Sequence, residues 1–155
     1  MPTDIRTATE ADLPRLVEMA RDMHAESPRY RHLDFSAEKT ARAILTLLTH
    51  AEGVAVVAEK EGHIVGMLGG FVTEHFFGRD KVACDLGLYV VPDERGSSLA
   101  PRLVRAFESW AREAGAADCV MGVSTEVMAE RTAALYERMG YVMSGFTMRK
   151  DLKHV

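Results

Sequence analysis

The amino-acid sequence predicts one α+β domain, in which helices flank a mixed, mostly antiparallel central sheet. Apolar residues alternate with turn signals over positions 53–91, which indicates a run of strands. Before and after that run, apolar residues recur at helical spacing. The chain has 155 residues, enough for one hydrophobic core. We therefore expect a single domain over residues 1–155 with the element order β-α-α-β-β-β-α-β-α-β.

The N-terminal part is predicted to contain a short strand and two helices. Residues 4–8 are a candidate edge strand, and Thr9 is a candidate N-cap for the first helix. That helix is expected to end before Pro28, where the polar and aromatic loop SPRYRHLDF lies. Ser36 is a candidate cap for the second helix, whose apolar stripe is Ala43, Ile44, Leu47 and Leu48.

Three strands are predicted to follow as a meander. GVAVVAEK and HIVGMLGGFVTEH flank the turn at Glu61 and Gly62 and read as a hairpin, and KVACDLGLYVV follows the turn FFGRD. A helix with the stripe Leu99, Leu103, Phe107, Trp110 and Ala114 comes next. The short buried strand DCVMGVS, the helix AERTAALYERMG and a last strand or hairpin, YVMSGFTMRKDL, complete the chain.

Composition and charge exclude several classes of protein. The formal net charge of -4 disfavours a general nucleic-acid binder, which needs a basic face. There is no apolar run of membrane-spanning length and no signal-peptide pattern, so we expect a cytoplasmic protein without membrane contact. Cys84 and Cys119 lie far apart in the sequence, and each is in an apolar run, so we expect both to be buried, reduced thiols. The six histidines lack ligand spacing, and we expect no metal.

The stretch VVPDERGSSLAPRLV joins the third meander strand to a helix and has two interpretations. Small residues at a helix N-terminus let an anion approach amides that have no intrahelical acceptor, and Arg95 could add a charge-assisted contact. The stretch is equally well explained as a tight turn with Ser97 or Ser98 as the N-cap. The stretch alone does not choose between the two.

Two further motifs resemble the GCN5-related N-acetyltransferase (GNAT) family. LGLYVVP precedes the turn, and AALYERMGY ends the penultimate helix. The family's pyrophosphate motif is Q/R-x-x-G-x-G/A, and here Arg95 and Ala100 occupy its first and last places. The predicted element order is also similar to that of the family over nearly the whole chain. The resemblance implies the family's fold and acetyl-CoA as co-substrate.

The resemblance also implies roles for individual residues. Backbone groups of the third meander strand would bind the pantetheine arm, and the following turn would hold the pyrophosphate. The residues so assigned are Leu88, Tyr89, Val90, Arg95, Gly96, Ser97, Ser98, Leu99 and Ala100. Tyr136 would stand near the thioester sulfur, where a phenol with a pKa of ~10 can protonate a departing thiolate. The alternative for Tyr136 is a tyrosine of the core.

The chain departs from the family's pattern at several places. Ser98 replaces the inner glycine of the motif, and Pro101 lacks an N–H. Cys84 stands where many members carry a glutamate, so no general base is carried over. Asp85 is the nearest carboxylate and lies on the opposite face of the strand unless a bulge intervenes. Asp85 could bind a substrate ammonium, or it could pair with Arg79 or Lys81.

The resemblance places the amine acceptor over the SPRYRHLDF loop and the ends of the central strands. Candidate residues are Tyr30, His32 and His75, with Glu126 as a weaker candidate at the end of the fifth strand. These aromatic residues could equally pack on the core, and His75 could be a surface histidine. Family members are often dimers, so a homodimer is a further expectation, with Phe76 and Phe77 as candidate contacts if they are exposed.

The sequence therefore predicts an acetyl-CoA-dependent N-acetyltransferase. It would act on a primary amine of a small molecule or protein by direct transfer in a ternary complex, without a metal. The alternative is a non-catalytic CoA-binding or regulatory module on the same fold. A dinucleotide-binding oxidoreductase is disfavoured, because it needs G-x-G-x-x-G at the first strand-helix turn of a parallel unit.

Overall fold

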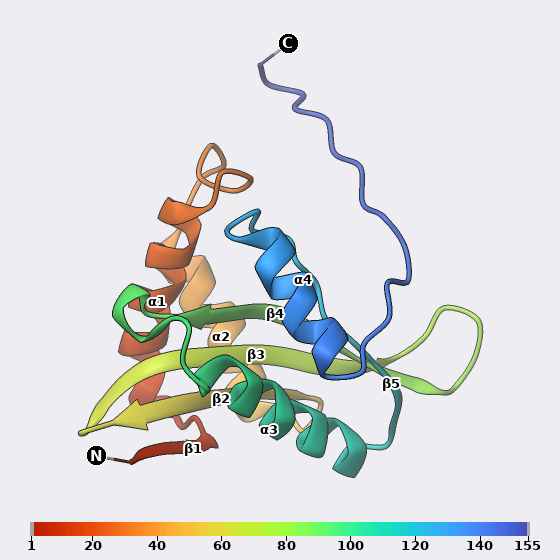
Figure 1. Ribbon diagram of the computed structural model, residues 1–155, viewed down its shortest axis with the longest axis horizontal. Coiled ribbons are helices and arrows are strands. Elements are labelled where there is room, and N and C mark those ends of the chain that lie inside the picture. The colour runs from red at the N-terminus through yellow and green to blue at the C-terminus, as the bar shows by residue number, and fades with distance from the viewer. Residues whose placement is uncertain (1, 155) are drawn as a thin grey trace.

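The computed structural model describes residues 2–154, which fold into three layers (Figure 1). The central layer is a five-stranded sheet with the order β1-β2-β3-β4-β5. Each of the strands β1 to β4 pairs antiparallel with the next one along the chain, and β5 pairs parallel with β4. This confirms the predicted mixed, mostly antiparallel sheet. The strands are β1 (Thr3–Thr7), β2 (Gly53–Lys60), β3 (His63–Glu74), β4 (Lys81–Val90) and β5 (Ala116–Val120).

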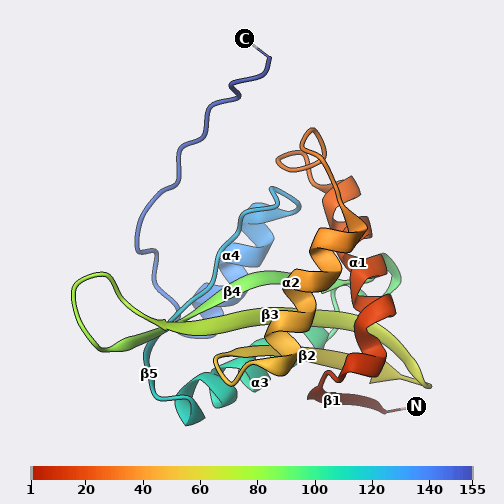
Figure 2. The same ribbon diagram turned by 180° about the vertical axis from the view of Figure 1, so that it is seen from behind.

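Two helices cover each face of the sheet. α1 (Leu13–Glu26) and α2 (Ala37–Thr49) lie on one face, and α3 (Leu99–Glu113) and α4 (Ala129–Arg138) lie on the other (Figures 1 and 2). The predicted cap of α2 is confirmed, because the Ser36 hydroxyl accepts from the Lys39 amide at 3.2 Å. Thr9 forms a capping box with Asp12 at the 3-10 turn before α1, and the N-cap of α1 itself is Asp12. Short 3-10 turns at Glu10–Asp12 and Pro92–Glu94 precede α1 and α3.

Alternating side chains of the strands fill two separate cores. In β2, Val54, Val56 and Ala58 pack under α3, whereas Ala55 and Val57 pack under α1. This alternation explains why a nearly continuous apolar run forms a central strand covered on both faces.

The predicted stripe of α3 is the main contact on its face. Leu99, Leu103 and Phe107 are buried, and the Phe107 ring stacks on Trp110 with centroids 5.6 Å apart. Gly70 of β3 lies under this ring, where a Cβ atom would approach the Phe107 side chain to 2.5 Å. The close packing of α3 therefore requires a residue without a side chain at position 70.

A bulge in β4 changes the alternation of its side chains. Gly69 of β3 pairs with Gly87, whereas Gly70 pairs with Asp85, so Leu86 has no partner on β3. Before the bulge, the odd residue Ala83 packs in the core under α3. After the bulge, the even residues Leu88 and Val90 do so, and Tyr89 belongs to the α1 side.

The pairing of β4 with β5 ends where the bulge begins. β5 pairs with Lys81–Cys84, and residues 85–90 have no partner on that side among the residues described. The parallel pair therefore separates towards the C-terminal ends of its strands. This opening in the sheet is where a ligand can reach the backbone of β4.

The last predicted element is wrong. Residues 141–152 form no strand within the described part of the chain, and the segment runs away from the domain after α4 (Figure 1). The Tyr141 hydroxyl donates to Glu108 at 2.8 Å, and beyond this anchor the chain turns away from the free edge of β5. A strand requires a partner for its backbone groups, and this segment has none within the described chain.

Candidate active site

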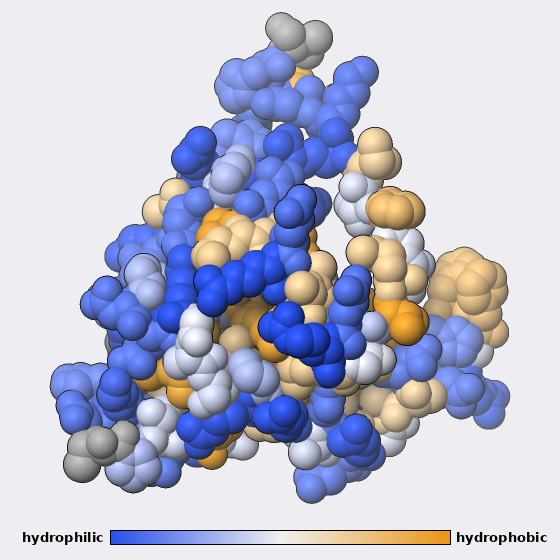
Figure 3. All heavy atoms as spheres, in the orientation of Figure 1, coloured by the Kyte–Doolittle hydropathy of each residue, from blue (hydrophilic) through white to orange (hydrophobic). Residues whose placement is uncertain are grey.

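A cavity of about 1130 Å³ lies where β4 separates from β5. It is lined by α1 and α2, by β4 beyond the bulge, by the turn before α3, by the β5–α4 segment and by α4. Figure 3 shows a hollow with apolar side chains at its base and hydrophilic side chains around its rim. Its volume is slightly above the usual ~300–1,000 Å³ range of ligand pockets, so it can hold a large ligand or two smaller ones.

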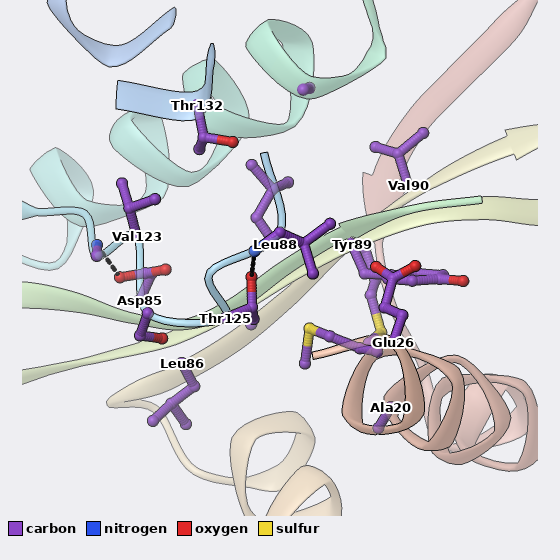
Figure 4. A pocket seen from close by; sticks show the side chains of 18 of the residues that line it. Ala20, Glu26, Asp85, Leu86, Leu88, Tyr89, Val90, Val123, Thr125 and Thr132 are labelled. Carbon is purple, nitrogen blue, oxygen red and sulfur yellow. Dashed lines mark hydrogen bonds between the residues drawn. The ribbon is translucent and has the colours of Figure 1, made fainter. Parts of the chain in front are cut away.

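The bulge places Asp85 in this cavity. Asp85 lies on the face of the sheet that carries α3 and α4, and its Oδ1 atom accepts from the Gly122 amide at 2.8 Å (Figure 4). Burial raises the pKa of the Asp85 carboxyl above its ordinary 3.8, and the Gly122 hydrogen bond opposes that change. In the described chain Asp85 pairs with neither Arg79 nor Lys81. The carboxylate is therefore a stronger base than an exposed aspartate.

Tyr136 lines the same cavity from α4. Its side chain is buried, and burial raises the pKa of its hydroxyl, with a further increase from the negative charge of Asp85. Tyr136 therefore remains a neutral phenol at physiological pH. The predicted alternative of a core tyrosine is also partly true, because the ring packs in the α3 core and lies 5.6 Å from the Tyr141 ring.

The turn before α3 presents backbone amides without acceptors. Among residues 2–154, the amides of Gly96, Ser97 and Ser98 donate to no protein group. Ser97, not Ser98, provides the side-chain cap, because its hydroxyl accepts from the Leu99 amide at 3.3 Å. Gly96 has φ +83, a conformation that favours glycine. The capped turn and the anion site are thus compatible in one segment.

Arg95 lines the cavity, but its guanidinium is bound by other groups of the protein. Its guanidinium donates to both oxygens of Glu26 at 2.7 and 2.9 Å and to the Val90 carbonyl at 2.8 Å. The Tyr89 ring lies beneath it, 5.4 Å from Cζ. Arg95 therefore ties the turn to the end of α1, and its predicted phosphate contact stays a prediction.

Three further arginines line the cavity, and they were not identified as candidate site residues from the sequence. Arg105 of α3 and Arg131 and Arg138 of α4 line the cavity, and none makes an ion pair within the described chain. The Arg131 guanidinium lies 3.0 Å from the position that a Cβ atom of Gly96 would occupy. The i,i+7 spacing of Arg131 and Arg138, which puts both on one helix face, is the signal that could have found them.

The α1–α2 loop and the β5–α4 segment contact each other and enclose the end of the cavity where the acceptor is expected. Tyr30 lines it as predicted, together with apolar residues of α1 and α2. The buried Ser27 hydroxyl donates to the Thr125 carbonyl at 2.7 Å and accepts from the Tyr30 amide at 3.1 Å. This link holds the α1–α2 loop against the β5–α4 segment.

The other predicted acceptor residues lie outside the cavity lining. His32 is exposed in the α1–α2 loop, and His75 lies in the β3–β4 turn, where its Nδ1 atom accepts from the Phe77 amide at 3.1 Å. Glu126 is 3.9 Å from Arg149. Of the predicted turn residues, Leu99 is buried in the core and Ser98 does not line the cavity. We therefore remove His32, His75 and Glu126 from the candidate acceptor wall.

The described residues contain no group of three or more His, Cys, Asp or Glu side chains that could hold a metal ion. Within residues 2–154, no helix is both long and apolar enough to cross a bilayer. Cys84 and Cys119 are both free, and burial raises the pKa of each thiol.

Comparison with known proteins identifies relatives of this chain and of its fold. One relative, described as probable N-acetyltransferase family 8 member 5 of Mus musculus, is 35% identical over 97 residues. Those residues make up 62% of this chain and 41% of the mouse protein, so the match spans less than half of that relative.

Solved acetyltransferases share the fold at low sequence identity. An aminoglycoside N-acetyltransferase in complex with CoA has a TM-score of 0.79 at 14% identity, over 98% of this chain and 95% of its own. Glucosamine-6-phosphate N-acetyltransferase from Arabidopsis thaliana has a TM-score of 0.75 at 16% identity, over 99% and 100%. A putative acetyl transferase from Pyrococcus furiosus has a TM-score of 0.76 at 24% identity, over 97% and 100%. A family model matches residues 15–141, and the chain belongs to the acetyltransferase (GNAT) family.

Proposed function

We propose that the protein is an acetyl-CoA-dependent N-acetyltransferase. It transfers the acetyl group directly to a primary amine of a small molecule or a protein while both substrates are bound. One observation carries this proposal: a single cavity joins an end with free backbone amides and unpaired arginines to a partly buried carboxylate and a buried phenol. A ligand with phosphates at one end and a reactive acyl group at the other fits this arrangement.

The residues present fit CoA. The free amides of the turn at Gly96–Ser98 and the unpaired Arg105, Arg131 and Arg138 would bind its phosphates. The backbone of β4 beyond Cys84 has no partner on the β5 side within the described chain and would bind the pantetheine arm. Acetyl-CoA supplies an acyl thioester, which is the reactive group of the transfer.

Asp85 and Tyr136 have opposite tasks in this proposal. The Asp85 carboxylate accepts the proton that the acceptor ammonium must lose before its nitrogen can attack, directly or through one water molecule. Tyr136 holds a proton on its phenol oxygen, which passes to the departing thiolate. A backbone amide of β4 polarises the carbonyl that is attacked. Proton exchange with solvent returns both side chains to their starting states.

Calorimetric titration followed by an acceptor screen tests this function. Acetyl-CoA and CoA should each bind saturably, and at least one primary amine should yield an acetylated product by mass spectrometry. Binding without turnover on any amine would favour the non-catalytic CoA-binding module. No binding at millimolar concentrations would leave only the family and fold.

A further inference from the structure

The wall of the cavity that α1, α2 and the loop between them form is mostly apolar. It includes Ala20 and Met23 of α1, Phe35 of the loop, and Ala43, Ile44 and Leu47 of α2. The Phe35 ring packs on His24, with ring centroids 5.3 Å apart. Most of this wall therefore offers hydrocarbon surface to a ligand rather than hydrogen-bonding groups.

The floor beside this wall is the backbone of two glycines that pair with each other, Gly69 of β3 and Gly87 of β4. A Cβ atom on Gly87 would lie 3.0 Å from the Met23 Cε atom, and one on Gly69 would lie 3.2 Å from the Leu47 Cδ1 atom. Both glycines therefore face α1 and α2. We call the space lined by these four residues and Ile44 the α1–α2 pocket. Because methionine is unbranched, Met23 can change rotamer to admit an apolar group.

The carboxylates that line the cavity match a ligand with one positive charge. Four acidic residues of the described chain line it, and Glu26 and Glu94 are already in ion pairs with other residues. Asp34 is exposed, and the exposed Lys39 on the same wall carries the opposite charge. Asp85 is thus the one partly buried carboxylate of the cavity without a cationic partner in the described chain. A second buried ammonium group would lose its hydration without compensation.

We propose that the acceptor is a small primary amine that carries one positive charge and an apolar chain or ring. This inference rests on the proposed function and narrows its acceptor. The apolar group lies in the α1–α2 pocket, and the ammonium loses its proton to Asp85, directly or through water. The N–C bond then forms as the C–S bond of the thioester breaks, and the departing thiolate takes the proton of Tyr136.

The contact between the α1–α2 loop and the β5–α4 segment favours a small molecule over a side chain of a protein. The Arg29 guanidinium donates to the Ser124 carbonyl at 3.4 Å, in addition to the hydrogen bond between Ser27 and Thr125. Two contacts therefore hold the loop in place. A lysine of a protein would bring its backbone amides under this loop, and burying amides against apolar side chains is unfavourable.

Acetyl transfer to matched amines tests this inference. From ethylamine to hexylamine, kcat/KM should rise about fourfold for each added methylene, the gain expected for burying one CH2 group. Hexamethylenediamine has the same chain with a second ammonium group, and its kcat/KM should be at least about tenfold lower than that of hexylamine. The methylamide of Nα-acetyl-lysine contains the pentylamine chain, and its kcat/KM should be at least about tenfold lower than that of pentylamine.

A variant of the wall should reverse the preference. Ala43→Asp adds a carboxylate at an exposed position of α2 that lines the cavity. It should lower kcat/KM for hexylamine and raise it for hexamethylenediamine, each about tenfold, because the second ammonium gains a partner. Thr46→Asp is the matched control, because it adds the same charge at an exposed position of α2 outside the cavity lining. Equal changes for both amines, or the same reversal in Thr46→Asp, would overturn the inference.

Binding and turnover together distinguish a wrong acceptor class from a wrong reaction. Hexylamine should raise the melting temperature of the CoA complex more than the same concentration of hexamethylenediamine does. Turnover that favours hexamethylenediamine or the lysine derivative would overturn the inference and leave the proposed function standing. If no amine is acetylated, the proposed function fails, and the melting temperatures then decide the ligand class. A larger rise with hexylamine would support an apolar monoamine, whereas equal rises, or none, would overturn it.

Discussion

Asp85 and Tyr136 lie on the same face of the sheet, and their proton affinities are coupled. Burial raises the pKa of the Tyr136 hydroxyl, and the negative charge of Asp85 raises it further. When Asp85 takes up a proton, its charge and therefore its contribution to the pKa of Tyr136 disappear. Proton uptake by Asp85 thus makes Tyr136 a better donor, and the proposed mechanism requires this order, in which the ammonium loses its proton before the thiolate gains one.

Tyr136→Phe should lower turnover by about 10²-fold, the usual effect of losing a general acid. Acetyl-CoA affinity should stay within about twofold, because the ring and its packing are retained. Steady-state kinetics and calorimetry measure the two quantities. Tyr141→Phe is the control, because its hydroxyl binds Glu108 rather than the cavity, and it should keep most of the activity. Full turnover in Tyr136→Phe would rule out the acid role.

Asp85→Asn should remove the base while keeping the hydrogen bond to the Gly122 amide, since an asparagine Oδ1 also accepts. In the wild type, kcat/KM should fall as the pH falls through the raised pKa of Asp85, and this limb should be absent from the variant. An identical acid limb in both proteins would assign the titration to another group.

Asp85→Asn also tests how much the burial of the Asp85 charge lowers the stability of the fold. Because folding raises the pKa of Asp85 above 3.8, the stability that it contributes is lost as the pH rises through the raised value. Asp85→Asn should therefore melt at the same or a higher temperature than the wild type at pH 7, and the difference should shrink towards pH 4. A clearly lower melting temperature at pH 7 would contradict the raised pKa.

Arg131→Ala should weaken acetyl-CoA binding about tenfold, as expected for the loss of a charge-assisted contact to phosphate. Binding of acetyl-pantetheine, which lacks the phosphates, should change little. Arg42→Ala is the control, because Arg42 pairs with Glu38 on α2 outside the cavity. Calorimetry at two salt concentrations measures the dissociation constant of each ligand for each protein. Equal losses for both ligands would mean that Arg131 acts on the fold and not on phosphate.

Gly70→Ala should destabilise the protein by about 1–3 kcal/mol, because its Cβ atom would lie 2.5 Å from the Phe107 ring and 2.6 Å from the Cys84 carbonyl oxygen. Gly78→Ala in the β3–β4 turn is the control and should stay within about 0.5 kcal/mol of the wild type. Urea unfolding gives both values. A neutral Gly70→Ala would show that α3 can shift without loss of packing.

Local periodicity in the sequence predicts most of this fold, and tertiary geometry accounts for what it misses. The helices, the meander and the turn before α3 depend on neighbouring residues, so their patterns are visible in the chain. His75 was misplaced because antiparallel strands put the β3–β4 turn at the opposite end of β4 from the turn before α3. Arg131 was missed because its approach to Gly96 joins α4 to the turn before α3, and these two segments are far apart in sequence. The absent last strand has the right alternation but no partner within the described chain.

The bulge at Leu86 shifts the phase of β4, and this has a consequence for how the strand can vary. Odd positions before it and even positions after it face α3 and α4. Substitution of Leu86 leaves that phase intact. Deletion of this one residue would remove the bulge and restore uniform alternation, and every other residue of β4 would keep its present face, because Gly87 would then follow Asp85 directly. Lineages that keep this site should therefore vary freely in the identity of residue 86.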